Sequence, residues 1–129
     1  MAFVVRNESR SVLPTVAWRA IKNKIVSRRY DLGLVFTSSK RMMELNRRYR
    51  GKTGPTNVLA FGLDKNEGEI FMGLGIAKRE AAERGTPYSA YVLFLYIHAL
   101  LHLKGFDHDT RRASVRMDRE EKKWLNALQ

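Results

Sequence analysis

The chain has 129 residues, which suffice for one domain over residues 1–129 with a modest core and are too few for two. Its 24 lysines and arginines outnumber 13 acidic residues, giving a net charge of +11, and residues 1–50 alone hold 12 basic and 3 acidic side chains. Cysteine is absent and the longest apolar run, residues 90–97, is too short to cross a bilayer, which excludes disulfides, thiolate metal sites and a membrane span. We expect a cytoplasmic protein, because the first ten residues also lack the apolar segment of a signal peptide.

The N-terminal part of the chain predicts a strand, a helix and a second strand. Residues 2–5 are apolar and are followed by a polar segment, which is typical of a short strand. Residues 12–27 place apolar side chains at helical spacing, and Pro14 suits a first helical turn. Residues 30–36 alternate in polarity and predict the second strand.

The middle of the chain predicts a helix followed by two paired strands. Residues 37–39 offer an N-cap for a helix that runs to about Tyr49 and ends at a glycine-containing loop. Residues 57–63 and 69–74 are apolar and predict strands. The turn-forming cluster 64–68 lies between them, so we expect a hairpin.

The last third of the chain predicts three helices, at residues 77–84, 88–103 and 110–128. The helix at 88–103 is apolar nearly all round, which indicates a central and buried position. The order of elements predicts the α+β class, with a single small mixed sheet of about four strands packed against about five helices.

All three histidines fall within eleven residues, in the stretch HALLHLKGFDH. His98 and His102 are four apart, so a helix places both imidazoles on one face. Gly105 can end the helix and let the chain bring His108 back toward them. Three nitrogen ligands leave a fourth position for water, as in catalytic zinc sites, whereas the alternative is three unrelated histidines with one or two buried in the core.

The spacing H-x-x-x-H-x-x-G-x-x-H also matches zinc proteases of the metzincin type. In those enzymes the residue after the first histidine is the glutamate that acts as general base. Here that residue is Ala99, whose methyl group accepts no proton. Peptidase activity is therefore excluded on chemical grounds.

Two longer motifs give the chain a family resemblance. HALLHLKGFDH resembles the signature H-G-x-x-H-L-x-G-[YF]-D-H of the YbeY family of bacterial endoribonucleases. LNRRYRGKTGPTNVLAF, at residues 45–61, resembles that family's second signature, L-N-x-x-Y-R-G-K-x-x-P-T-[DN]-V-L-S-F. The departures spare the histidines; they are Ala99 for glycine, Ala60 for serine, Glu69 for aspartate in GEI at residues 68–70, and a more basic segment at residues 109–117.

The resemblance implies a metal-dependent endoribonuclease that cuts single-stranded RNA in ribosomal RNA maturation, notably at the 16S 3′ end, and in ribosome quality control. It implies one Zn²⁺ per chain on His98, His102 and His108, and it marks Arg50 as functionally required. We therefore expect Arg50 and His98 to be catalytic residues. The expected partners are ribosomal RNA and other single-stranded RNA, the small ribosomal subunit and its assembly factors, with no membrane.

Elementary chemistry agrees with the role that the resemblance gives to Arg50. RNA cleavage builds negative charge on phosphorus-bound oxygens, and a guanidinium can hold two of them at once. A solvated charge at a helix end is the alternative. Five further basic residues are expected to contact phosphates or to remain solvated surface charges; they are Lys40, Arg41, Arg47, Arg48 and Lys52.

Three other polar residues have roles that the sequence leaves open. Asp107 precedes the third histidine and could hold a ligand imidazole, accept a proton, or close a turn through its own backbone. Thr56 and Asn57 could line a cleft or cap the loop before a strand.

Two other functions compete with the endoribonuclease. A non-catalytic RNA-binding factor of ribosome assembly would use the metal structurally, and the missing general base favours it. A metallohydrolase of small substrates would not need the basic N-terminal region.

Overall fold

The computed structural model describes residues 2–128 and has one mixed sheet with helices on both of its faces. Its strands are β1 (Phe3–Asn7), β2 (Asp31–Thr37), β3 (Val58–Asp64) and β4 (Glu67–Gly73). Its helices are α1 (Trp18–Ile25), α2 (Ser39–Arg50), α3 (Leu74–Arg84), α4 (Tyr88–Lys104) and α5 (Arg111–Leu128). The strand order is β1-β2-β4-β3, and β3 alone runs antiparallel to its neighbour. This arrangement confirms the predicted α+β class.

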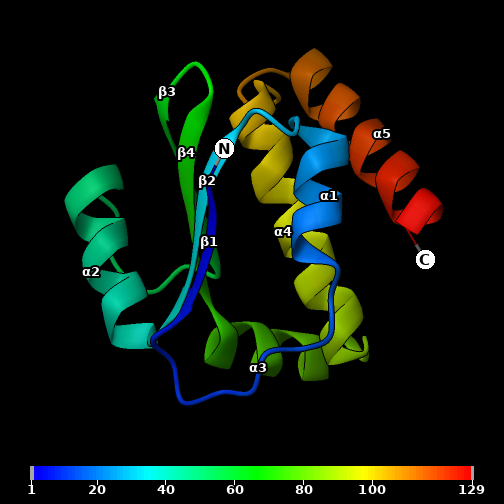
Figure 1. Cartoon of the computed structure of the whole chain (residues 1–129). Helices are drawn as coiled ribbons and strands as arrows, with labels where there is room; N and C mark the ends of the chain where they lie inside the picture. The colour runs from blue at the N-terminus through cyan, green and yellow to red at the C-terminus, as the bar shows by residue number, and fades with distance from the viewer. Residues whose placement is uncertain (1, 129) are drawn as a thin grey trace.

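The two faces of the sheet are covered by different numbers of helices. Helix α2 lies alone on one face of the sheet, and α1, α4 and α5 lie on the other, with α3 crossing one end (Figure 1). The central strand β2 is accordingly buried on both faces, since Leu34 and Phe36 contribute to the main core while Val35 and Thr37 are also buried. No helix within residues 2–128 combines the length and the apolar character needed to cross a membrane.

The first helix begins six residues later than the sequence predicts, at Trp18 rather than at residue 12. Residues 12–17 are not helical, and Val12 is 85% exposed. Two causes act together. The ring of Pro14 disfavours a helical conformation at the preceding residue. The chain must also pass from the end of β1 to the helical layer before α1 can start (Figure 1).

Strands β3 and β4 form the predicted hairpin, with a tighter turn than expected. Pairing extends to Asp64 and Glu67, so β4 begins two residues early and runs directly into α3. Gly68 fits where a larger residue would not. A Cβ there would lie 2.9 Å from the carbonyl oxygen of Phe61 and would also collide with the hydroxyl of Tyr30.

Helix α4 is the centre of the core, as its all-round apolar sequence predicts. Val92, Leu95 and Leu100 are almost completely buried, and the helix packs against β3, α1, α3 and α5. The hydroxyl of Tyr96 donates to the carbonyl oxygen of Trp18 at 2.8 Å, which ties α1 to α4. The helix that carries two of the histidines is thereby held on several sides.

Candidate metal centre

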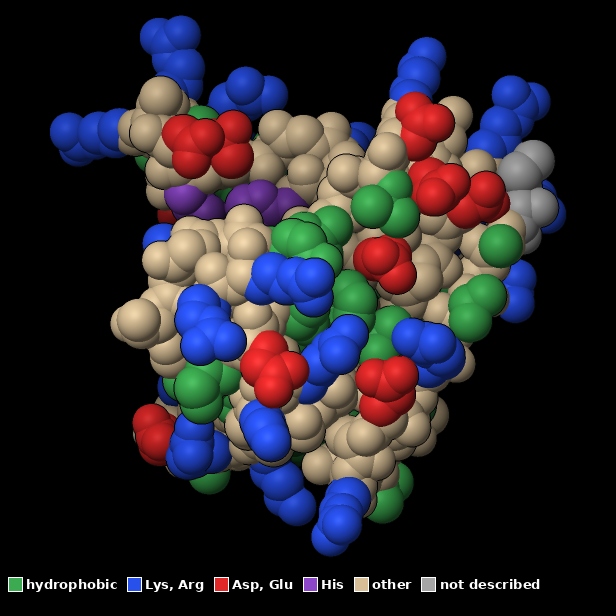
Figure 2. Space-filling view, turned by 90° about the vertical axis from the view of Figure 1, so that its left-hand side faces the viewer, with side chains coloured by type: hydrophobic (Ala, Val, Ile, Leu, Met, Phe, Trp, Pro, Cys, Tyr) green, Lys and Arg blue, Asp and Glu red, His purple; other side chains and the backbone are tan. Residues whose placement is uncertain are grey.

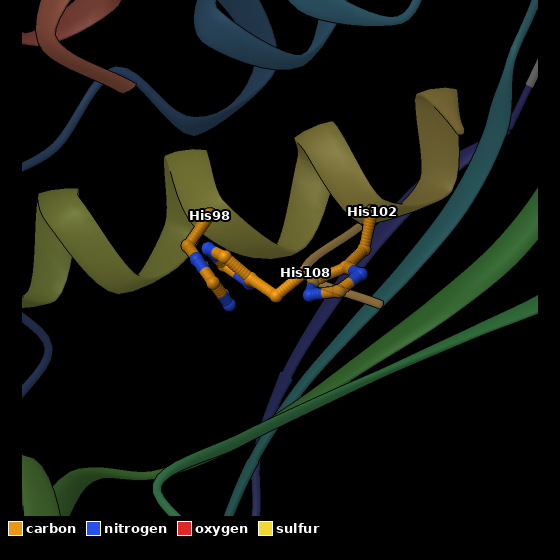
Figure 3. Close-up of side chains that lie close together, drawn as sticks. All are labelled: His98, His102 and His108. Atoms are coloured by element: carbon orange, nitrogen blue, oxygen red, sulfur yellow. The ribbon is translucent and has the colours of Figure 1, made fainter. Parts of the chain in front are cut away.

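The three histidines converge at the C-terminal half of α4 (Figure 3). His98 and His102 leave the same face of the helix, and their ring centroids are 4.7 Å apart. Gly105 ends the helix with a left-handed φ of 114°, a conformation that favours glycine, and its amide donates to the carbonyl oxygens of Leu101 and His102. The chain then returns and places the His108 ring 5.4 Å from that of His98 and 6.1 Å from that of His102.

The donor set fits a transition metal. One nitrogen from each ring lies within 4.8 Å of the others, close enough for a single ion to be shared. Burial, followed by the neighbouring imidazoles of His98 and His108, lowers the pKa of His102 below its ordinary value. A lowered pKa keeps His102 neutral at pH 7, which is the form that binds metal. The three histidines can therefore hold a metal ion.

Glu121 fixes the orientation of His98. Its carboxylate Oε1 lies 2.8 Å from His98 Nδ1, and its side chain is buried on α5. A buried carboxylate accepts a hydrogen bond from Nδ1–H, which leaves the Nε2 lone pair for the metal site. The sequence carried a signal for this residue that our interpretation missed. Glu121 occupies the apolar stripe of α5, one helical turn after the buried Met117.

Asp107 takes the turn role among the alternatives left open. Its Oδ1 accepts a hydrogen bond of 3.0 Å from the backbone amide of Asp109. Among the described residues, the carboxylate hydrogen-bonded to a histidine ring is Glu121 from a distant helix, whereas Asp107, beside His108 in the sequence, accepts from the backbone. Local sequence placed Asp107 near the site but favoured a bond to its own backbone.

A cleft of about 590 Å³ opens in front of the histidines. Its walls combine all three with Arg50 from the end of α2 and Asp109 from the loop after α4. Arg50 is brought there because Gly51 ends α2 with a φ of 65° and turns the chain toward β3. Of the described residues that line the cleft, Asp109 is the one with a carboxylate. Asp109 directly follows His108 in the sequence but was not among the predicted site residues.

Thr56 and Asn57 both line the same cleft. The amide Nδ2 of Asn57 donates to Glu80 Oε1 at 3.0 Å, and the hydroxyl of Tyr91 donates to the same oxygen at 2.9 Å. Burial and the bond to Glu80 raise the pKa of Tyr91, so its hydroxyl stays a donor. The start of β3 is thus fastened to α3 and α4 beside the histidines.

The chain matches the family described as endoribonuclease YbeY over residues 4–129. It belongs to the YbeY family. A curated endoribonuclease YbeY from Chelativorans sp. is 36% identical over 107 residues, covering 76% of this chain and 66% of the relative. The relative from Aromatoleum aromaticum is 41% identical over 87 residues, covering 65% and 56%. A solution structure from Thermotoga maritima superposes with a TM-score of 0.67 at 25% identity, covering 97% of this chain and 87% of that one.

This chain covers less than two thirds of the length of the first curated YbeY relatives that it matches. Within the matched part, two of the departures from the YbeY signatures line the cleft. Ala99 lies between the two helical histidines, and Ala60 puts a methyl group where the signature has a serine hydroxyl. The cleft wall of this YbeY protein therefore lacks a hydroxyl at residue 60 and carries an additional methyl group at residue 99.

The five other basic residues assigned to phosphate contact lie outside the cleft. All are exposed, on α2 or just after it; they are Lys40, Arg41, Arg47, Arg48 and Lys52. Lys40 and Arg47 line a separate groove of about 440 Å³ with Met43 and Glu44. In the view onto the α2 side, lysine and arginine side chains spread over the surface below the histidines (Figure 2). The structure thus gives this YbeY protein a basic approach to its cleft.

Proposed function

We propose that the protein is a metal-dependent endoribonuclease that cuts single-stranded RNA in ribosomal RNA maturation, at the 16S 3′ end, and in ribosome quality control. The observation that carries this proposal is one cleft lined by three convergent histidines and by Arg50. Membership of the YbeY family, with relatives named as endoribonucleases, supports it. The net charge of +11 suits a polyanionic substrate.

The metal would be one Zn²⁺ per chain, held by His98, His102 and His108. Three imidazoles without a thiolate are a ligand set that suits zinc. When bound in such a site, zinc supplies Lewis-acid polarisation of a phosphoryl oxygen and activation of water.

The protein's own side chains would do the rest. The guanidinium of Arg50 would hold two non-bridging phosphate oxygens and stabilise the charge that grows on them. Asp109 faces the cleft and would accept a proton there. Glu121 would keep the His98 ring in one orientation. These roles make Arg50 and His98 the principal catalytic assignments.

The basic residues of α2 would draw the RNA toward the cleft. Their charges act over distances of about 10 Å at moderate salt, which suits capture rather than chemistry. The partners would then be ribosomal RNA, the small ribosomal subunit and its assembly factors. We place this activity in the cytoplasm, in a single domain that spans the chain.

One experiment separates the enzyme from a non-catalytic assembly factor. Metal-loaded protein is incubated with single-stranded RNA beside a His102→Ala variant, and both cleavage and binding are measured. Cleavage by the parent that is lost in the variant supports the endoribonuclease. RNA binding without cleavage by the metal-loaded parent supports the assembly factor instead.

A further inference from the structure

Tyr49 is a large aromatic residue whose side chain is exposed at the cleft instead of being buried in the core. It is 59% exposed, and among residues 2–128 it is the one aromatic side chain among the large hydrophobics that face solvent. It also lines the cleft of the three histidines and directly precedes Arg50. Exposing an aromatic ring forgoes the free energy of its burial, so the ring is a candidate for contact with a ligand.

The Tyr49 ring is supported from the protein side. Its centroid lies 5.2 Å from that of Phe61, which in turn lies 5.9 Å from Phe71 in β4. The Arg48 guanidinium lies over the ring, 5.7 Å from its centroid and within cation–π range, and its own side chain is exposed. The Tyr49 ring is thus held by its contacts with Phe61 and Arg48, while much of its surface remains exposed to solvent.

We propose that Tyr49 is a stacking platform for an unpaired nucleobase of the RNA substrate. This inference rests on the proposed function, because it identifies the part of the substrate that the same cleft recognises. Arg50 would hold a phosphate, and the adjacent Tyr49 would receive the base of a neighbouring nucleotide. Bases in a duplex have both faces covered by their neighbours, so this contact selects single strands.

The test compares two oligomers of equal charge. Metal-loaded protein is titrated with a ten-nucleotide oligoriboadenylate and with a ribose-phosphate oligomer of the same length without bases. Binding is followed by fluorescence anisotropy on ice, within an interval over which electrophoresis shows that the RNA has not yet been cleaved. Tyr49→Leu keeps apolar contact with Phe61 but removes the flat ring, whereas Tyr49→Phe keeps the ring.

We expect Tyr49→Leu to weaken binding of oligoriboadenylate roughly 5- to 100-fold, the range for loss of one stacked base. Tyr49→Phe should stay within about twofold of the parent, because stacking needs the ring and not the hydroxyl. The oligomer without bases should bind Tyr49→Leu and the parent equally. The salt dependence should be unchanged in Tyr49→Leu, since no phosphate contact is removed.

Leu63→Ala is the matched control, because Leu63 is 55% exposed on β3 but does not line the cleft. It should bind both oligomers as the parent does. Equal oligoriboadenylate binding by Tyr49→Leu and the parent overturns the stacking role, and so does an equal loss on both oligomers. A parent that binds neither oligomer overturns the proposed function itself.

Discussion

Helix α4 is packed in the core and presents His98 and His102 to the cleft, whereas helix α2 lies at the surface and presents Tyr49 and Arg50. Almost half of the residues of α4 are buried, and His98 and His102 are its polar side chains at the cleft. Helix α2 buries only Met42, Leu45 and Asn46 and ends in a cluster of arginines. A metal centre needs ligands that do not move, and a helix packed in the core holds the backbone of its ligands in place. A surface that captures a flexible polyanion needs exposed and mobile charges instead.

Substitution of a histidine on the α4 side should have the largest effect. We expect purified protein to contain close to one transition-metal ion per chain, and His98→Ala, His102→Ala or His108→Ala to lose it, because two imidazoles hold zinc far more weakly than three. Elemental analysis measures the ratio. Lys104→Ala, at the exposed end of the same helix, is the control and should keep its metal. Full metal content in the triple-alanine protein would contradict the assignment.

On the α2 side, Arg50→Ala should slow RNA cleavage by a factor on the order of 10²–10³, the range for loss of one preorganised donor. Metal content and melting temperature should barely change, because the side chain is exposed at a helix end. Arg50→Lys should rescue poorly, since an ammonium makes no bidentate contact.

Arg48→Ala is the matched control for Arg50, two residues away and outside the cleft lining. Single-turnover kinetics at saturating RNA should show its cleavage step unchanged. Cleavage by Arg50→Ala at the parent rate would reduce Arg50 to a surface charge.

Loss of the hydrogen bond between Glu121 on α5 and His98 on α4 should have an intermediate effect. Glu121→Ala should lower metal affinity by about 10- to 100-fold, the usual cost of losing the group that orients a ligand histidine. Glu121→Gln keeps an acceptor and should lose less. Competition with a chelator measures both affinities without any RNA. Glu120→Ala, the neighbouring position on α5, is the control. Unchanged affinity in Glu121→Ala would show that the bond to His98 is structural only.

The smallest effect on RNA binding should come from substituting a single basic residue of α2 that lies outside the cleft. RNA binding by the parent should fall by orders of magnitude as salt rises a few-fold, because several phosphates are neutralised. Arg48→Ala should weaken binding several-fold at low salt and reduce the slope of log affinity against log salt by about one. If the RNA affinity of the parent did not change with salt concentration, α2 would not be the surface that binds RNA.

Several features of the fold were predictable because their causes are local. The hairpin of β3 and β4 follows from two apolar runs around a turn cluster. Helix α4 follows from a long apolar sequence closed by Gly105. Pro14 opposed a helix at the preceding residue, but a start as late as Trp18 was not predictable from residues 12–17, because the path between β1 and the helical layer depends on how the layers stack.

By itself the sequence determined that His98, His102 and His108 meet. Their spacing on one helix face and a glycine at the helix end are conditions that act within eleven residues. Only the tertiary structure decided that Glu121 rather than Asp107 holds a histidine ring, and that Tyr49, Arg50 and Asp109 share the cleft. Those groups come from elements distant in sequence, and their meeting depends on how α2, α4 and α5 pack around the sheet. The sequence gives the chemistry of each side chain, but its neighbours from distant elements depend on how those elements pack.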